Sequence, residues 1–137
     1  MNLNLAKKYI QENFENIGIN LEYEQTEDRL TVKGNLTKEG LGDFLFVMTV
    51  YHNSLNTVGF SMYFNQIEAT PEVYKLLNNF NKDAYMLYAI EDEFLILEHT
   101  AQRVKEEEIG AYAMDILDEL NDDEVFGLLK PLVDLTF

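Results

Sequence analysis

The sequence contains no cysteine, which excludes disulfide bonds, thiolate metal ligands and cysteine nucleophiles. It also has no long hydrophobic run: the longest apolar stretches, near residues 44–50 and 84–90, are far shorter than the ~20 residues that span a bilayer. No stretch rich in proline, glycine or serine divides the chain, and no internal repeat occurs. The length of 137 residues therefore predicts one domain over residues 1–137.

Basic residues are scarce. Ten lysines and arginines stand against 25 aspartates and glutamates, so the formal net charge is −15 at pH 7. A surface of this sign disfavours direct binding to the phosphates of nucleic acids or to an anionic membrane. Hydrophobic residues make up 47% of the chain, enough for a sizeable core despite the charge. Because the N-terminal residues lack the basic-then-apolar order of a signal peptide, we expect a cytoplasmic location.

Catalytic signatures are also missing. The only histidines, His52 and His99, lie in different predicted elements and lack the spacing of a metal site. The only serines, Ser54 and Ser61, are not flanked by the glycines of a nucleophile elbow, and no phosphate-binding loop occurs. Two carboxylates could still meet across a cleft, as acid/base chemistry requires. The sequence favours a protein that is not an enzyme and has no catalytic residues, no metal and no cofactor.

The first half of the chain changes from helical to strand periodicity. Apolar residues at helical spacing predict a helix over 3–17 that is capped by Gly18. Alternating apolar and polar residues then predict a hairpin with one solvated face, built around a polar turn at 26–28. Two further strands are predicted at 43–51 and 58–64, joined by a short turn.

The second half opens on a helix start at Thr70-Pro71-Glu72, which combines a capping hydroxyl, a proline and an acid in the first turn. The remaining elements are expected as strands over 84–90 and 94–99 joined at Glu91-Asp92-Glu93, a helix over 105–120 and a short helix over 125–129. Pro131 is expected to bend or end that last helix. The resulting order, αββββαββα plus a C-terminal element, predicts an antiparallel α+β fold.

The third, fifth and sixth predicted strands are apolar on both faces, as expected where both faces of a sheet are covered. Three long helices could provide that cover. Alternatively, a partner covers one face through an exposed patch that contains Tyr51, Tyr63 and Tyr85, because tyrosine offers a large contact area with a polar tip. These three tyrosines are therefore candidate partner-binding residues.

Acidic residues concentrate in the segment 91–124, which has thirteen acids and two bases. Glu106, Glu107 and Glu108 fall in the first turn of a predicted helix, where negative charge complements the helix dipole. One interpretation is a solvated surface that keeps the protein soluble. The other is a surface for a basic partner, with these glutamates as candidate contacts, so that the chain inhibits a DNA- or RNA-binding protein by mimicking nucleic acid.

A family resemblance adds to this reading. The segment Leu76-Leu77-Asn78-Asn79-Phe80-Asn81, followed by an aromatic strand, the acidic turn and Val104-Lys105-Glu106-Glu107-Glu108 at a helix start, resembles the YbjN family. The likeness covers about residues 71–120 as sequence and most of the chain as an order of elements. YbjN-like proteins are bacterial sensory transduction regulators that share the fold of type III secretion chaperones. The resemblance implies a small acidic homodimer that binds polypeptides as a chaperone-like or regulatory module, with no catalytic residue to carry over.

Overall fold

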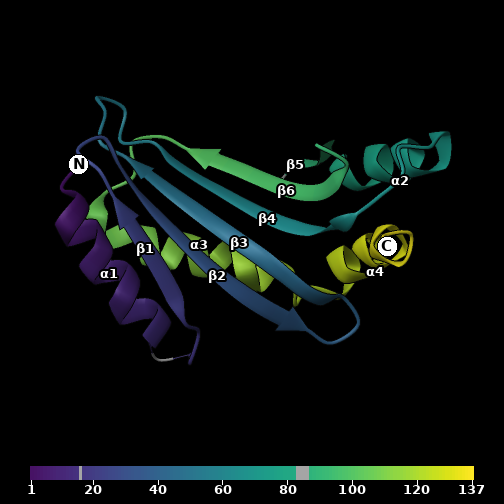
Figure 1. Cartoon of the computed structure of the whole chain (residues 1–137), viewed down its shortest axis with the longest axis horizontal. Helices are drawn as coiled ribbons and strands as arrows, with labels where there is room; N and C mark the ends of the chain where they lie inside the picture. Colours follow the sequence, from purple (N-terminus) through teal and green to yellow (C-terminus); the bar gives the residue numbers. More distant parts are fainter. Residues whose placement is uncertain (16, 83–86) are drawn as a thin grey trace.

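The computed structural model describes residues 1–15, 17–82 and 87–137 and contains a six-stranded sheet (Figure 1). Across the sheet the strands follow the order β1-β2-β3-β4-β6-β5. Their bounds are Leu21–Gln25 (β1), Arg29–Lys38 (β2), Gly42–Tyr51 (β3), Val58–Gln66 (β4), Leu87–Glu91 (β5) and Phe94–Ala101 (β6). All neighbouring pairs are antiparallel, which confirms the predicted sheet.

The described helices are α1 (Leu3–Glu15), α2 (Pro71–Asn81), α3 (Glu106–Glu119) and α4 (Asp123–Asp134). The α+β class and the order αββββαββα with an added C-terminal helix are therefore as predicted. Residues 84–86 of the predicted fifth strand lie outside the described residues, and β5 begins at Leu87.

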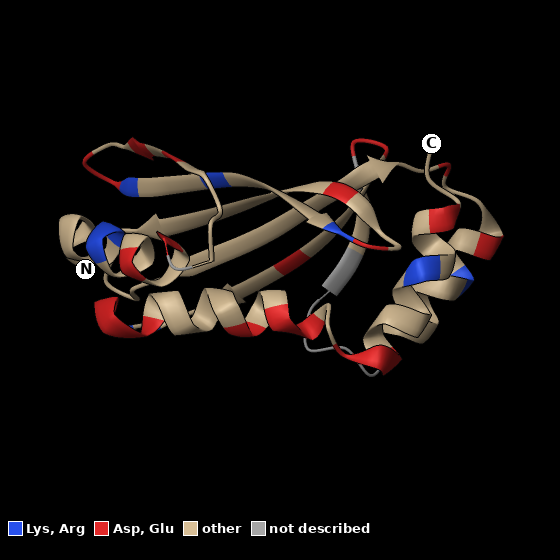
Figure 2. Cartoon of the chain, turned by 90° about the horizontal axis from the view of Figure 1, so that it is seen from below, with Lys and Arg blue, Asp and Glu red and all other residues tan. Residues whose placement is uncertain are grey.

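One face of the sheet, called the inner face below, forms the floor of the hydrophobic core. Period-two alternation places its side chains as predicted, because Phe44, Phe46, Met48 and Val50 of β3 are all buried. α1 and α3 pack against each other beneath this face (Figure 2), while α2 and α4 form a second pair at one end of the sheet (Figure 1). Side chains from both helix pairs and from the sheet join in a single buried cluster.

The helix starts form where capping residues occur in the sequence. Thr70 Oγ1 accepts a hydrogen bond from Val73 N at 3.3 Å at the start of α2. Asp122 Oδ1 accepts from Glu124 N at 2.9 Å and from Val125 N at 3.2 Å at the start of α4. Each cap satisfies backbone N–H groups that the first turn of a helix leaves without partners.

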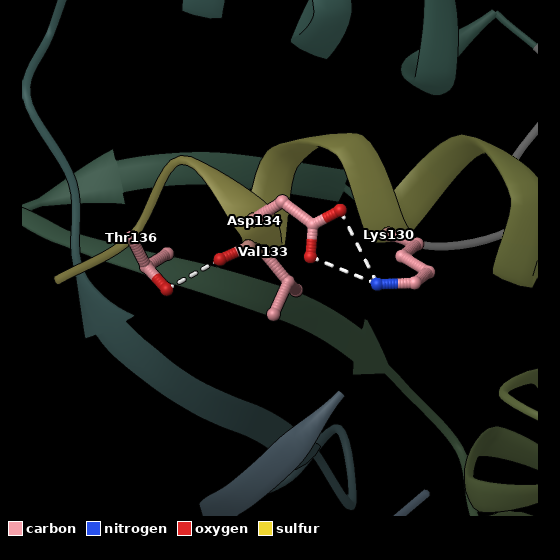
Figure 3. Close-up of polar contacts among 4 residues, drawn as sticks. All are labelled: Lys130, Val133, Asp134 and Thr136. Carbon is pink, nitrogen blue, oxygen red and sulfur yellow. Dashed lines mark hydrogen bonds and ion pairs between the residues drawn. The ribbon is translucent and has the colours of Figure 1, made fainter. Parts of the chain in front are cut away.

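The prediction that the last helix stops near residue 129 is wrong, because α4 continues through Pro131 to Asp134. Leu129 and Leu132, on either side of the proline, are both fully buried, and this packing holds the helix although proline removes one of its hydrogen bonds. Lys130 Nζ pairs with Asp134 Oδ1 across the proline at 2.9 Å, and beyond it Thr136 Oγ1 donates to the carbonyl of Val133 at 2.5 Å (Figure 3).

Candidate functional site

The opposite face of the sheet, called the outer face below, has none of the described helices packed on it. In the view of Figure 2, the helices lie below the strands or at their end, and the upper side of the sheet is open. Register and alternation assign residues of the three central strands to this face: Leu45, Val47 and Thr49 of β3, Gly59, Ser61 and Tyr63 of β4, and Ile96, Glu98 and Thr100 of β6. The expectation that the helices cover both faces is thus wrong for the part of the chain that the structure describes.

The centre of the outer face is apolar. Tyr63 lies opposite Leu45 on one side and opposite Ile96 on the other, and Ile96 in turn lies opposite Ala89 of β5. Leu45, Tyr63 and Ala89 are half-buried, although no described helix covers them, and Ile96 is fully buried. Alternating strands of a one-sided sheet normally carry polar residues at such positions, so this apolar row makes the face a candidate contact surface.

A shallow hollow of about 270 Å³ adjoins the apolar row. Gly59 is part of its lining, and an added Cβ there would meet no atom within 4 Å, so the missing side chain leaves open space on this face. Its lining is rich in hydroxyl groups, which come from Thr49, Ser61 and Thr100, and it includes the half-buried Glu98. Such a hollow can accept a small side chain and hydrogen-bond its polar atoms.

The two described members of the predicted tyrosine patch share a face of the sheet but do not lie side by side. Tyr51 and Tyr63 both lie on the outer face, but Tyr63 is opposite Leu45, six residues along β3 from Tyr51. At ~3.4 Å per residue these positions are ~20 Å apart, too far for one contact between the rings. Tyr51 is 37% exposed at the end of β3. Tyr85 lies outside the described residues.

The three predicted glutamates lie in the first turn of α3, on the helix side of the sheet and not on the outer face (Figure 2). Glu106 Oε1 accepts a hydrogen bond from Asn2 N at 2.7 Å, and this bond holds the pKa of the Glu106 carboxyl below its usual range. Glu106 therefore ties α3 to the start of α1. Glu107 and Glu108 are exposed, and the dipole of α3 favours their charge.

The charges of the outer face lie mainly on β1 and β2, to one side of the apolar row. Among the strand residues whose side chains the structure describes, register and alternation assign four acids and two bases to this face: Glu22, Glu24, Arg29, Lys33, Asp43 and Glu98. Red segments in Figure 2 mark both ends of α3 and the start of α4, while most of the sheet is uncoloured. A partner seated on the apolar row and the adjoining hollow would thus meet apolar and hydroxyl groups more than charge.

A second polar group lies on the inner face, where His99 Nδ1 and Tyr112 Oη of α3 form a hydrogen bond. Burial lowers the pKa of His99 from its usual value near 6.5 and raises the pKa of Tyr112 to about 12. Both shifts favour the neutral forms. The pair is a structural contact between β6 and α3, because both side chains point into the layer between sheet and helix.

We expect acid to destabilise the protein partly through His99. Its pKa is lower in the folded state, so the unfolded chain takes up the proton first as the pH falls below ~6.5, and stability drops until the folded pKa is passed. Urea denaturation between pH 8 and pH 5 should show this loss in the wild type and a smaller one in His99→Gln. An unchanged slope in His99→Gln would contradict the assignment.

Other kinds of site find no support among the residues described. Residues 1–15, 17–82 and 87–137 contain no group of three or more histidine and acidic side chains placed to hold a metal ion. Within the same ranges, every helix is too short or too polar to cross a membrane.

Comparison with known proteins adds no name to the site. No protein-family model matches the chain, and the search of curated proteins finds no match either. The outer face is therefore identified as a candidate site by its geometry alone.

Part of this surface is predicted by the sequence. The apolar character of Leu45 and Val47 follows from the two-sided pattern of the third strand. The hollow at Gly59 was missed, and its signal was a glycine at an outward position of a strand that otherwise alternates regularly.

Proposed function

We propose that the chain is a non-enzymatic protein-binding module that contacts a polypeptide partner through the outer face of its sheet. The observation that carries the proposal is the half-buried apolar row of Leu45, Tyr63 and Ala89, which adjoins the buried Ile96, on a face that no described helix covers. Uncovered apolar surface of this kind is typical of interaction sites. At this row hydrophobic contact, and not electrostatic attraction, is the main source of affinity.

The proposal includes a homodimeric state and a chaperone-like or regulatory role. Both come from the resemblance of residues 71–120 to the YbjN family. The alternative role, inhibition of a basic protein by mimicry of nucleic acid, has less support because Glu106 and Asp122 already serve contacts within the chain. A cytoplasmic location is part of the same proposal.

Val47→Lys tests the outer face, because it places a charge beside the apolar row without touching the core. We expect proteins captured from the lysate of the native host by the wild type to be lost with Val47→Lys, since burying the new charge opposes contact. Tyr74→Lys is the matched control: Tyr74 is 51% exposed on α2, away from the outer face, and its replacement should leave capture unchanged. Equal capture by both variants would contradict the proposed surface. Circular dichroism and thermal melting confirm that each variant is folded.

A further inference from the structure

The hollow on the outer face contains a charged side chain. Eight described residues line it, and Glu98 is the only acid or base among these eight. In register Glu98 of β6 lies opposite Ser61 of β4, and Ser61 lies opposite Val47 of β3, so small and aliphatic residues adjoin the carboxylate on this face. Lys33, the base in the same row, lies opposite Val47 and is three strands from Glu98, ~14 Å at ~4.8 Å per strand. The described lining of the hollow therefore carries negative charge.

The size of the hollow suits one side chain. Its volume of about 270 Å³ is below the ~300–1,000 Å³ of pockets that hold small molecules and cofactors. Gly59 lies opposite Thr49 on one side and opposite Thr100 on the other, and the absence of a side chain at Gly59 leaves the space above β4 open. We therefore expect the occupant to be a single side chain that enters from a partner.

The lining matches the two parts of a lysine side chain. The carboxylate of Glu98 and the hydroxyl groups around it accept hydrogen bonds, which suits the three donors of an ammonium group. A carboxylate accepts several hydrogen bonds, so Glu98 can bind an ammonium group and keep its contacts within the chain. Val47 offers apolar contact to the methylene stem. The compact ammonium of lysine fits this small hollow better than the planar guanidinium of arginine.

We propose that this hollow binds a lysine side chain of a polypeptide partner, with Glu98 as the acceptor of its ammonium group. The inference rests on the proposed contact through the outer face and names the chemistry of the partner at that face. The net charge of −15 attracts cationic polypeptides and repels a second copy of the chain. The occupant is therefore assigned to a basic segment of a different polypeptide.

The hollow and the apolar row together define a spacing in the partner. Gly59 in the lining and Tyr63 in the row are four residues apart on β4, ~14 Å at ~3.4 Å per residue. In an extended segment that lies along β4, the side chains at positions i and i+4 point to the same side and are the same distance apart. A lysine in the hollow thus places the side chain four residues away on Tyr63 and Leu45. We expect that side chain to be large and apolar.

Peptide titration followed by NMR tests the role of the ammonium group. The probes are two blocked peptides of opposite order, Lys-Thr-Thr-Thr-Leu and Leu-Thr-Thr-Thr-Lys, each with a control in which norleucine replaces lysine and keeps its stem without the charge. We expect at least one lysine peptide to shift the amide signals of Gly59 and Thr100 and to bind about tenfold or more tightly than its control. High salt should reduce this difference, because it screens the charge. Equal affinities of the lysine and norleucine peptides, or no binding by either, would overturn the lysine site.

Two variants of the hollow should remove the preference for lysine over norleucine. Glu98→Gln keeps the shape of the side chain and removes its charge, while Gly59→Val occupies part of the hollow, where an added Cβ would meet no atom within 4 Å. Valine favours strands, so we expect the second variant to fold, which thermal melting checks. Glu24→Gln, which removes an acid from β1 on the same face, is the matched control and should keep the preference. If both variants of the hollow keep the preference as well, the site is wrong.

Failure of this site and failure of the proposed surface give different results. If Val47→Lys abolishes capture of host proteins while the lysine and norleucine peptides bind equally, the lysine site is wrong and the proposed surface stands. If Val47→Lys leaves capture unchanged, the proposed surface is wrong, whereas a peptide preference that Glu98→Gln removes still supports the lysine site. A wild-type dimer that Glu98→Gln and Lys33→Gln each dissociate in sedimentation would place Lys33 of a second copy in the hollow. That result would overturn the assignment to a different polypeptide.

Discussion

Replacing Phe46 by alanine is expected to lower the free energy of unfolding by about 3–5 kcal/mol. The Phe46 ring is fully buried and stacks on Phe14 of α1 and on Phe60 of β4, so its loss leaves a cavity between sheet and helix. Urea denaturation measures the change, and Phe46→Leu, which fills most of the space, should cost much less.

A second substitution makes this test specific. An added Cβ at Gly34 would lie 2.5 Å from Phe46 Cε1 and 2.9 Å from Leu21 Cδ2, so Gly34→Ala should destabilise the wild type. In the Phe46→Ala background most of that overlap is absent, and the same change should be neutral or stabilising by about 0.5–1 kcal/mol. Equal destabilisation in both backgrounds would show that the ring does not cover Gly34 as described.

Gly110→Ala is expected to destabilise the protein by about 1–3 kcal/mol, although alanine is the better helix former. Gly110 is buried in α3 where α1 packs closest, and an added Cβ would overlap the amide of Asn13 and lie 3.0 Å from its Cβ. Asn13 Nδ2 also donates to Tyr9 O at 2.8 Å, which holds the amide in place.

The control for this prediction is Gly127→Ala, in the interior of α4. Its added Cβ would meet no atom within 4 Å, so the same substitution should stabilise the protein by up to about 1 kcal/mol. In an Asn13→Ala background the penalty of Gly110→Ala should largely disappear, as thermal or urea denaturation would show. A stabilising effect of Gly110→Ala alone would mean that α1 and α3 are less closely packed than described.

The elements of this fold were predictable because their signals are local. The alternation from Val58 to Phe64 places one face of β4 in the core, and Thr70-Pro71 marks the start of α2 in the sequence itself. The passage of α4 through Pro131 was not predictable, because the packing of Leu129 and Leu132 overrides a local signal.

The surfaces were harder to predict than the elements, because they depend on contacts between distant residues. A two-sided apolar strand indicates cover on both faces, but the sequence does not say that every described helix leaves the outer face free. The hydrogen bond from Asn2 N to Glu106 Oε1 joins residues 104 positions apart. Glu106, a predicted partner contact, is therefore used in a contact within the chain. The extension of β2 past its ladder with β1 likewise depends on where β1 begins and ends, which periodicity places only to within a few residues.

The packing of α1 on α3 has a consequence for synthesis on the ribosome. α1 leaves the ribosome before the six strands and before α3 (residues 106–119), the helix that it packs against. The apolar side of α1, with Ile10 and Phe14, is therefore not fully covered until the sheet and α3 have been made. Contacts of such sequence separation also slow folding, which prolongs the exposure of this helix to chaperones and proteases.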